Sequence, residues 1–535
     1  MGELLRWTTL ARRWAIASSA APDATFLEFE RPDGELVAWT YGEFADAVER
    51  VRRGLASRGL RRGDCLHLIL PNCPAFIAVM LAAARSGLVF LSSDPRSTPD
   101  ELSRQSDRVS PALAVCGSDQ AANYEASLAP APALVVDPLD SEFTALSGSG
   151  PLQEIEEPEP RDPLALMFTS GTTAAPKIVE LTQANYAFAG DVMAAACGLR
   201  AGSRFLVVLP LFHANAQYYS VAASISVGAT VELVAGFSAS RFLEQAERLH
   251  ATHASLFAAP IRMILARGGE TALSRRLEHV WFSQNLTDDE YDRFAALVGV
   301  RPRQIYGMTE TAPAVLMSRR LDPPKMTVGT PTLGCHVRLR DPTTGLAVET
   351  GETGEIQVGG IPGLSLFAGY RGNAKAFSDG IAESEESGFV WFKTGDLARL
   401  DAEGEAVFVG RGGDMLKVAG ENVSCVEVEA TIVKHRDVLD AAVVGVPDAL
   451  RDEVPIAFVV PVSGAPATLA EDLMQWCEQQ LSGPRCPREI HVIDELPRTA
   501  VGKIQRFRLV DRASVLRTSS DVESGPEQET SPAVT

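Results

Sequence analysis

The residues best suited to binding a polyphosphate lie in one segment, residues 167–177, where an apolar strand pattern runs into a polar loop. The loop combines four hydroxyl side chains, one glycine and a final lysine, which are Thr169, Ser170, Gly171, Thr172, Thr173 and Lys177. Backbone amides, hydroxyl donors and a cation are the groups that phosphate oxygens require. The Gly-Lys-Ser/Thr ending of a Walker loop is missing, so the segment predicts a phosphate-binding loop of another kind. A polar surface loop between a strand and a helix is the alternative.

The segment of residues 305–311 carries groups that suit a magnesium nucleotide. It places an aromatic ring, a hydroxyl and a carboxylate close together, from Tyr306, Thr309 and Glu310. The ring can stack on a base, the hydroxyl can hold a phosphate, and the carboxylate can bind Mg²⁺ through oxygen. The spacing therefore predicts a second part of a nucleotide site.

Three charged side chains in the second half of the chain complete the set of candidate residues. Asp396 follows the aromatic strand pattern of residues 389–392, and its carboxylate can accept hydrogen bonds from two ribose hydroxyls. Arg411 lies beyond it at a glycine-rich linker, and Lys503 follows a glycine near the end of the last domain-sized segment. A turn cap is the alternative role for Asp396, and a solvated surface charge is the alternative for Lys503.

Short apolar strand patterns alternate with helical patterns through the first half of the chain. Residues 41–58 have apolar side chains at helical spacing, and residues 65–70 form a short apolar run that ends at Pro71. Similar apolar runs recur at residues 88–91, 164–168, 205–209, 230–234, 255–257 and 279–282. Strands that alternate with helices indicate βαβ units and parallel sheets covered on both faces. We therefore predict an α/β fold with mostly parallel sheets.

The pattern changes near residue 337, and the predicted domain organisation follows from that change. Pairs of strand patterns up to residue 409 predict a β-rich subdomain. Residues 410–414 form a glycine-rich linker, and residues 412–513 alternate helices and strands in a small α+β domain. We expect a large N-terminal domain over residues 1–411. The tail of residues 514–535, rich in Ser, Glu, Pro and Thr, is expected to be disordered.

Composition excludes several classes of protein. The 535 residues include 69 acidic and 49 basic side chains, a formal net charge of −20, which disfavours a nucleic-acid partner or an anionic membrane surface. The eight cysteines show no CxxC or zinc-ligand spacing, so we expect reduced thiols and no metal cluster. No run of about 18 apolar residues and no signal-peptide pattern occurs. We expect a cytoplasmic protein without integral membrane association.

Together and in this order, the four motifs resemble those of the adenylate-forming enzymes, a superfamily of acyl- and aryl-CoA ligases, peptide-synthetase adenylation domains and beetle luciferases. The resemblance runs from about residue 20 to residue 512. Within the superfamily, Gly-Gly-Ile-Pro-Gly at residues 359–363 and Gly-Glu-Asn-Val-Ser-Cys-Val-Glu at residues 420–427 are most similar to the carnitine/crotonobetaine-CoA ligase type. The resemblance implies a large N-terminal domain that binds ATP and an acid, and a small mobile C-terminal domain.

The resemblance also implies two half-reactions. A carboxylate attacks the α-phosphate of MgATP to give an acyl-adenylate and pyrophosphate, and a thiol, usually that of CoA, then displaces AMP. The implied substrates are a small-molecule acid, ATP and CoA, and the implied metal is Mg²⁺. Because the catalytic lysine is carried on a mobile domain, the reaction can depend on closure of that domain.

Roles for the candidate residues follow from the same resemblance. The polar loop of residues 169–177 is implied to hold the β- and γ-phosphates. Tyr306 is implied to lie against adenine, with Gly307 in the same nucleotide-binding segment. Thr309 is implied to touch phosphate and Glu310 to hold Mg²⁺, so both are candidate catalytic residues.

The remaining implied roles concern the ribose and the reacting atoms. Asp396 and Arg411 are implied to bind the ribose, and Lys503 to bridge the attacking carboxylate and the α-phosphate. Because two anions must approach each other, a cation between them stabilises the developing charge. Rotation about the linker, at Gly412 and Gly413, would then remove Lys503 and admit the thiol.

Two further segments match regions that line the substrate in the superfamily. His213 lies in a segment beside the acyl pocket and the thiol tunnel, and Asn215 and Gln217 alternate with it, which could direct polar groups into the pocket. A histidine satisfied by backbone is the alternative. Gln284 and Asn285 stand where most relatives have a Gly/Ala-rich loop that lines adenine, and Asn285 is expected to bind the adenine amino group or the substrate. These polar side chains favour a small or polar acid.

One departure from the family pattern leaves the identity of the acyl acceptor open. Ala419 replaces the first glycine of a usual Gly-Gly pair in the loop that lines the thiol approach. We predict ATP-dependent adenylation of a small or polar organic acid followed by transfer to CoA. The alternative is another acceptor, which includes a carrier-protein thiol, an amine, or nitrite-dependent diazotisation of an aryl amine. A binding protein that lost catalysis is the remaining alternative, against which the presence of Glu310, Asp396, Arg411 and Lys503 argues.

Overall fold

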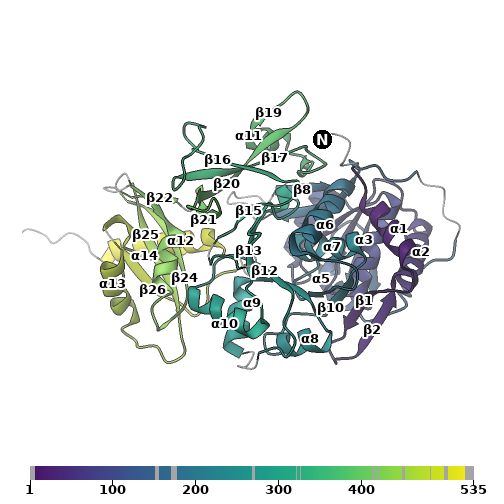
Figure 1. The fold of residues 1–535 in the computed structure, drawn as a ribbon, viewed down its shortest axis with the longest axis horizontal. Helices are drawn as coiled ribbons and strands as arrows, with labels where there is room; N and C mark the ends of the chain where they lie inside the picture. Colours follow the sequence, from purple (N-terminus) through teal and green to yellow (C-terminus); the bar gives the residue numbers. More distant parts are fainter. Residues whose placement is uncertain are drawn as a thin grey trace, which may run out of the picture. The chain divides into compact units, whose positions relative to one another are not determined.

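A computed structural model defines the fold, and its residues separate into two compact units. It describes residues 7–150, 156–169, 177–267, 272–320, 322–325, 327–412, 415–418, 421–448, 452–481, 483–498 and 504–523. The first unit comprises Met1–Thr394 and Ala398–Phe408, and the second comprises Gly395–Leu397 and Val409–Thr535. Figure 1 shows the elements of both units along the chain.

A seven-stranded sheet forms one half of the first unit. Its order is β18 (Gly369–Tyr370), β8 (Lys177–Thr182), β7 (Pro163–Thr169), β4 (Val89–Ser92), β3 (Cys65–Ile69), β5 (Leu113–Gly117) and β6 (Ala133–Val136). The strands from β7 to β6 pair in parallel, whereas β8 and β18 are added antiparallel at one edge. The sheet therefore ends in two antiparallel strands that come from distant parts of the sequence.

A nine-stranded sheet forms the other half. Its order is β15 (Thr330–Pro331), β14 (Leu316–Met317), β13 (Arg303–Tyr306), β12 (His279–Ser283), β11 (His253–Phe257), β9 (Arg204–Val207), β10 (Thr230–Val234), β1 (Thr25–Glu30) and β2 (Leu36–Thr40). The strands from β13 to β1 pair in parallel. Only the strands at the two edges are antiparallel. The predicted α/β fold with mostly parallel sheets is confirmed.

Helices connect and cover these strands. They are α1 (Leu10–Ala20), α2 (Tyr41–Ser57), α3 (Pro74–Ser86), α4 (Pro99–Val109), α5 (Ala121–Ala126), α6 (Gln183–Cys197), α7 (Ala222–Val227), α8 (Phe242–Arg248), α9 (Ala258–Arg267), α10 (Asp288–Val298) and α11 (Ala374–Gly380). Short turns are η1 (Ser118–Gln120) and η3 (Thr309–Thr311), and η2 (Asn215–Val221) is a π-helix. Helix α1 packs against α2, α3, α6 and α7, which lie together in Figure 1. Helix α3 is buried on nearly every side, as a helix that is apolar all round must be.

The β-rich subdomain predicted after residue 337 is a five-stranded sheet. It is ordered β16 (His336–Arg340), β17 (Thr353–Gly360), β20 (Val390–Leu400) and β19 (Ile381–Ser384), and β21 (Ala406–Arg411) also pairs with β20. Asp396 is part of β20 and Arg411 ends β21. The strand pair that carries these two residues therefore leads directly into the second unit.

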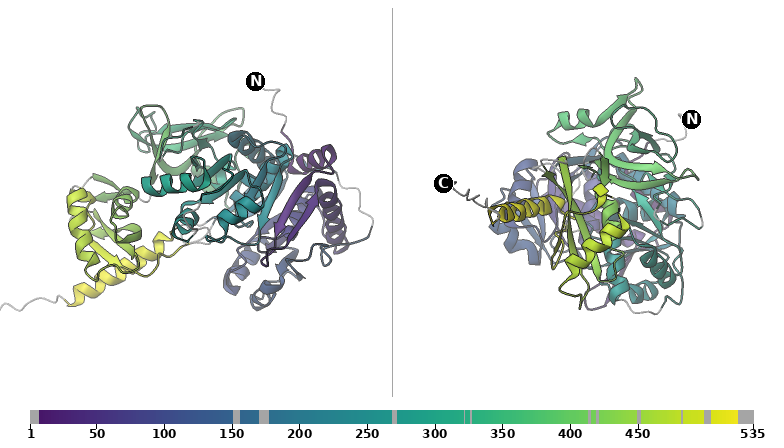
Figure 2. Two further views of the ribbon diagram at one scale, coloured as in Figure 1. Left: turned by 60° about the horizontal axis from the view of Figure 1, so that its bottom comes forward. Right: turned by 90° about the vertical axis from the view of Figure 1, so that its left-hand side faces the viewer.

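The second unit has a sheet of its own with helices against it. The order is β23 (Glu421–Ser424), β22 (Met415–Val418), β25 (Asp452–Pro461) and β24 (Val438–Asp448), and β26 (Glu489–Val492) pairs with β25. The helices are α12 (Cys425–Ile432), α13 (Leu469–Gln480) and α14 (Arg506–Glu523), and η5 (Gly483–Arg485) is a short turn. Figure 2 shows α14, in yellow, beside the strands of its own unit, and its Leu509 and Ala513 are buried against Ala442 and Val444.

Helix α14 differs from the sequence expectation at its end. It continues past Ala513 to Glu523, into the segment expected to be disordered, because Leu509 and Ala513 anchor it to the sheet. Residues 524–535 lie outside the described part of the chain. Within the described residues, no helix is both long and apolar enough to cross a membrane.

Three buried histidines make the stability of the first unit sensitive to acid. His67 is fully buried on β3, with Nδ1 3.3 Å from Ser106 Oγ and Nε2 2.8 Å from Ser93 Oγ. Burial lowers the pKa of His67 to about 4, and burial also lowers the pKa values of His253 and His279. A pKa depressed in the folded state favours the neutral ring. The resulting stability is therefore present above the unfolded pKa of about 6.5 and is lost as the pH falls.

We expect replacement of His67 by glutamine to reduce the loss of unfolding free energy between pH 7 and pH 5. From its depressed pKa, His67 alone accounts for about 2 kcal/mol of the unfolding free energy lost between pH 7 and pH 5. Urea denaturation of the wild type and His67→Gln at both pH values measures this difference. His250→Gln, which changes an exposed histidine, is the control. Equal losses in wild type and His67→Gln would contradict the prediction.

Candidate functional site

The predicted phosphate-binding loop joins two antiparallel strands of the seven-stranded sheet. Thr169 ends β7, Lys177 begins β8, and the two residues are paired across the strands. The loop therefore leads from strand to strand and not from strand to helix. Its Ser170, Gly171, Thr172 and Thr173 lie within residues 170–176, outside the described residues.

Lys177 and Glu310 converge on one tyrosine. The Lys177 ammonium lies 4.6 Å from the centre of the Tyr370 ring, and the Tyr370 hydroxyl donates a hydrogen bond of 3.0 Å to Glu310 Oε1. Glu310 is 4% exposed and Tyr370 7% exposed. The two predicted charged residues thus meet at one tyrosine, with Glu310 buried and Lys177 partly exposed. Sequence reasoning missed Tyr370, because no local pattern relates it to a carboxylate 60 residues earlier.

The segment after β13 is tightly packed around Tyr306 and Gly307. The Tyr306 ring stacks on Phe408, with ring centres 6.0 Å apart. A Cβ on Gly307 would lie 2.7 Å from the Tyr219 hydroxyl and 2.8 Å from Ala314 Cα, so only glycine fits there. Thr309 and Glu310 lie in the short turn η3, directly followed by Ala312 with a positive φ of 62°. A non-glycine residue in this conformation persists only where its surroundings hold it.

Gln284 and Asn285 form the adjacent loop, at the carboxyl end of β12. Because β12 and β13 are parallel neighbours, their carboxyl ends open on the same edge of the sheet, where ligands bind in folds of this kind. Gln304 of β13 donates from Nε2 to the Gln284 carbonyl at 3.0 Å and to Asn285 Oδ1 at 2.9 Å. The structure thus ties Asn285 to the strand that ends at Tyr306. Sequence reasoning missed Gln304.

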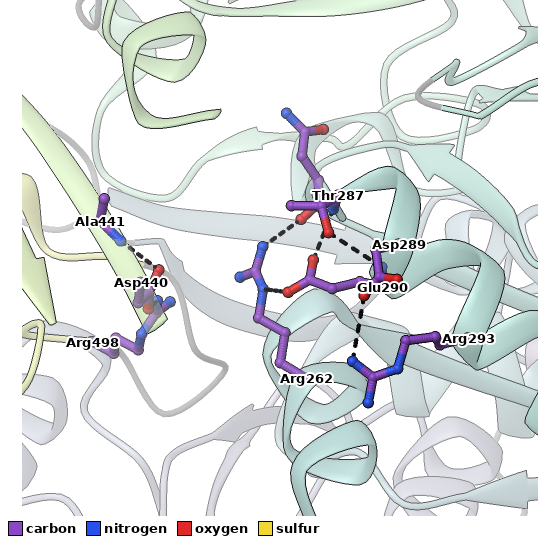
Figure 3. A network of polar contacts seen from close by, with 9 residues as sticks. Arg262, Thr287, Asp289, Glu290, Arg293, Asp440, Ala441 and Arg498 are labelled. Atoms are coloured by element: carbon purple, nitrogen blue, oxygen red, sulfur yellow. Dashed lines mark hydrogen bonds and ion pairs between the residues drawn. The ribbon is translucent and has the colours of Figure 1, made fainter. Parts of the chain in front are cut away.

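The Gln284–Asn285 loop is also held from its other side. Arg262 of α9 donates to the Asn285 carbonyl at 2.9 Å and pairs with Glu290 of α10 at 2.8 Å. Figure 3 shows Glu290 between Arg262 and Thr287, with which it forms a capping box at the start of α10. These contacts stabilise the positive φ of 74° at Gln284.

The segment with His213 is fixed by buried polar side chains. Asn72 accepts from the Leu211 amide at 2.7 Å and donates to the Leu209 carbonyl at 3.0 Å. The His213 ring is half-buried against Phe212, with ring centres 4.5 Å apart. His213 therefore lies at the end of a well-supported loop, immediately before the π-helix η2.

The structure differs from the expectation that Asn215 and Gln217 direct their side chains into one pocket with His213. Residues 215–221 form a π-helix, in which positions two apart do not share a face. Gln217 is fully buried and donates to the Leu211 carbonyl at 2.7 Å and to Ser92 Oγ at 3.2 Å. Asn215 accepts from Ser255 Oγ at 2.8 Å. Gln217 therefore supports the loop and does not line a pocket.

Tyr218, on the same π-helix, has a hydroxyl without a hydrogen-bond partner among the described residues. It is 1% exposed, and its ring packs edge-to-face against Tyr186 and Tyr219. Burial raises the pKa of this hydroxyl well above its usual value, with further contributions from Tyr219, Tyr186 and Glu310. It therefore remains a proton donor. An unsatisfied buried donor is uncommon in native proteins and indicates a missing partner.

Asp396 and Arg411, the two predicted ribose-binding residues, form an ion pair within the second unit. Arg411 Nε lies 2.9 Å from Asp396 Oδ1. The Asp396 side chain is 9% exposed and that of Arg411 is 40% exposed. The guanidinium therefore orients a sequestered carboxylate.

The loop that contains Lys503 lies outside the described residues, but its base is defined. Arg498 and Ile504 form an antiparallel bridge, and the Gln505 amide donates to the Pro497 carbonyl at 2.7 Å. Arg498 also pairs with Asp440 of β24, as Figure 3 shows. On the other side of the loop, Arg506 pairs with Glu429 of α12 at 2.7 Å. Two ion pairs therefore secure the ends of this loop to the second unit.

The single carboxylate of Glu310 suits Mg²⁺, which also binds substrate phosphates, better than a metal ion whose ligands all come from the protein. The described residues contain no cluster of three or more His, Cys, Asp or Glu that could hold a metal. Mg²⁺ binds to one or two carboxylates together with substrate phosphates and water. A single buried carboxylate beside a phosphate-binding segment is the donor set that this mode requires.

Comparisons with known proteins show which family this chain matches. A family model described as AMP-binding enzyme matches residues 14–371, and one described as AMP-binding enzyme C-terminal domain matches residues 427–503. The crotonobetaine/carnitine–CoA ligase of Escherichia coli O139:H28 (strain E24377A / ETEC) is 32% identical over 516 residues, 94% of this chain and 98% of the relative.

Two solved structures have a similar fold. The anthranilate CoA ligase AuaEII in complex with anthranoyl-AMP has a TM-score of 0.86 at 23% identity, over 97% of this chain and 99% of that one. A benzoate CoA ligase from Burkholderia xenovorans LB400 has a TM-score of 0.82 at 25% identity, over 94% of this chain and 100% of that one.

We expect Gln304→Leu to weaken ATP binding. The substitution removes the two hydrogen bonds that hold the Gln284 carbonyl and the Asn285 side chain. At about 1 kcal/mol each, their loss should raise the dissociation constant of ATP at least tenfold. Calorimetric titration of the full chain with ATP measures the change. Gln357→Leu, a buried glutamine in the five-stranded sheet, is the control, and an unchanged ATP affinity in Gln304→Leu would refute this role.

Proposed function

Since this chain belongs to the family of AMP-binding enzymes, we propose that it activates a carboxylic acid with ATP and transfers the acyl group to the thiol of CoA. Both family models match, and they cover most of the chain, so the membership predicted from the motifs is confirmed. The relative from Escherichia coli is named a CoA ligase and is similar over nearly its whole length, which supports CoA as the acceptor.

The observation that carries the proposal is the convergence of Lys177 and Glu310 on Tyr370. A cation at the end of a polar loop and a buried carboxylate meet in one cluster. This is the arrangement that a triphosphate and its metal need, because the cation attracts phosphate oxygens while the carboxylate holds the metal. The Glu310 carboxylate is buried, and a charge is retained in such a position only where it is paired, hydrogen-bonded or bound to a metal.

We assign the residues to steps of the first half-reaction. The polar loop of residues 169–177 binds the β- and γ-phosphates, and Tyr306 lies against adenine. Thr309 contacts phosphate, and Glu310 holds Mg²⁺, which neutralises phosphate charge when bound. The strained turn after β13 fixes these groups before substrate binds, which is favourable for transition-state stabilisation.

The second unit supplies the remaining groups in this proposal. The Asp396–Arg411 ion pair binds the ribose hydroxyls, and Lys503 stabilises the charge that develops between the carboxylate and the α-phosphate. We propose residues 1–411 and 412–513 as the functional domains. Asp396 and Arg411 fall in the second compact unit, but in this proposal they stay with the N-terminal domain when rotation at the linker exchanges Lys503 for the thiol. Gly413 and Ala419 lie outside the described residues.

The buried hydroxyl of Tyr218 supports a polar acid as substrate. It remains protonated, is unpartnered among the described residues, and interacts electrostatically with Glu310. A bound acid with an oxygen or nitrogen acceptor beyond its carboxylate would supply the missing partner. His213 and Asn285 are the further polar residues that we assign to the substrate and nucleotide pockets.

The metal and the location of the reaction complete the proposal. We propose Mg²⁺ as the metal, because a single buried carboxylate suits it. Most of the cysteines are buried, and we propose the reducing cytoplasm as the location.

The function is tested by measuring AMP and pyrophosphate release from ATP against a panel of organic acids, each with and without CoA. AMP release that requires an acid and CoA, with a product of thioester mass, is the expected result. Turnover with an acid but without CoA would indicate a carrier-protein or amine acceptor instead. Turnover with nitrite and an aryl amine, indifferent to CoA, would indicate diazotisation.

We expect Lys503→Ala to slow adenylation at least about 10²-fold with little change in ATP affinity. The lysine acts on charge that develops in the transition state, so its removal affects the rate more than ground-state binding. Single-turnover formation of acyl-adenylate measures the rate. Lys375→Ala, which removes an exposed lysine paired with Asp379, is the control. A Lys503→Ala protein that adenylates at the wild-type rate would exclude this mechanism.

We expect Tyr218→Phe to raise the KM of the acid about tenfold and to leave the protein at least as stable. Removing a hydroxyl that lacks a partner costs the free protein nothing, whereas a bound acid loses one hydrogen bond. Thermal melting and steady-state kinetics measure the two effects. Tyr41→Phe is the control: its hydroxyl bonds the Ala229 carbonyl at 2.8 Å, so it should lose stability at unchanged KM. An unchanged KM in Tyr218→Phe would refute the substrate contact.

A further inference from the structure

Tyr370 touches both charged residues of the phosphate and metal site, yet the proposed function gives it no role. Its hydroxyl donates to Glu310 Oε1 at 3.0 Å, and its ring lies under the Lys177 ammonium at 4.6 Å. The two contacts use different parts of one side chain, the polar tip and the aromatic face. They can therefore be removed separately by substitution.

We propose that Tyr370 is a positioning residue, which orients Glu310 for Mg²⁺ through its hydroxyl and holds Lys177 for the triphosphate through its ring. The inference rests on the proposed function, because it assigns Glu310 to the metal and Lys177 to phosphate. It adds a residue that touches neither substrate nor metal.

The backbone sets the distance between Tyr370 and Lys177. Tyr370 belongs to β18, which pairs antiparallel with β8 through Gly369 and Glu180 and through Tyr370 and Val179. The Arg371 amide donates to the Ile178 carbonyl at 2.9 Å, which extends this contact toward Lys177. Because β8 begins at Lys177, the pairing places the ring of Tyr370 at the mouth of the predicted phosphate loop.

The same segment holds Glu310 at two points. The Phe367 amide donates to the Glu310 carbonyl at 3.1 Å, and the Tyr370 hydroxyl donates to the Glu310 side chain. The Phe367 ring packs edge-to-face on Tyr370, with centres 5.0 Å apart, and limits its movement. A carboxylate can accept several bonds. A donor fixed on Oε1 therefore orients the carboxylate.

The segment is itself anchored to the first helix after β8. Asn185 of α6 donates to the Leu364 and Leu366 carbonyls at 2.9 and 2.8 Å, and Thr182 donates to the Gly363 carbonyl at 2.8 Å. Three side-chain hydrogen bonds thus add to the β18–β8 pairing in connecting the segment of residues 363–370 to β8 and α6. Tyr370 is supported by rigid structure on both sides, as a positioning residue must be.

The test is equilibrium binding of ATP to the full chain, without any acid, in EDTA and over a series of Mg²⁺ concentrations. Tyr370→Phe keeps the ring and removes the hydroxyl. We expect it to raise the Mg²⁺ concentration for half-maximal enhancement of ATP binding about tenfold, as substitutions behind a metal ligand do. Binding in EDTA should not change. Tyr370→Leu removes the ring as well and should also weaken binding in EDTA by about fivefold.

Tyr124→Phe is the matched control, since it removes a buried hydroxyl that bonds the Ala131 carbonyl at 3.2 Å elsewhere in the first unit. Tyr124→Phe should change neither the Mg²⁺ concentration for half-maximal enhancement of ATP binding nor the ATP binding in EDTA. A Tyr370→Phe protein with wild-type Mg²⁺ dependence would overturn the inference, as would an equal loss of binding with and without Mg²⁺, which is the result of a merely structural role. If the wild type itself showed no Mg²⁺-dependent ATP binding, the proposed function would fail together with the inference.

Discussion

The hydrogen bond from Tyr370 to Glu310 joins two sheets, and the candidate site depends on that connection. Tyr370 lies on the edge strand of the seven-stranded sheet, and Glu310 follows β13 in the nine-stranded sheet. The Phe367 amide strengthens the connection through the Glu310 carbonyl. Lys177 from one sheet and Glu310 from the other therefore meet at one tyrosine. A buried carboxylate is tolerated there because it is hydrogen-bonded.

Several unfavourable local features of the first unit lie in the segments that carry the candidate site residues. Gln284 and Ala312 have positive φ angles, residues 215–221 form a π-helix, and the Tyr218 hydroxyl lacks a partner among the described residues. Each of these costs stability, and such features tend to occur at functional sites. Around them, Gln304, Arg262 and Asn72 form well-satisfied hydrogen bonds to the loop backbone. The surrounding structure thus maintains conformations that the local sequence alone would not adopt.

In the second unit, ion pairs hold candidate site residues and the ends of a loop in place. Arg411 orients Asp396, and the pairs of Arg498 with Asp440 and of Arg506 with Glu429 secure both ends of the loop that carries Lys503. Pairs of this kind contribute little to stability when exposed, but they restrict geometry. In the proposed mechanism the second unit presents a single lysine, and a defined orientation of that lysine benefits from the restriction.

The sequence by itself determined the family and the α/β fold, and it predicted the candidate site residues. Residue types decide which ligand a segment can bind, as in the hydroxyls and lysine of residues 169–177, and apolar periodicity decides which segments become strands and helices. Only the tertiary structure decided that the phosphate loop joins antiparallel strands, that Gln217 is buried, and that Tyr370 and Gln304 support the site. These contacts arise where strands pair or loops meet across long stretches of sequence. Local patterns carry no record of such pairing, because it depends on how the whole chain buries its apolar surface.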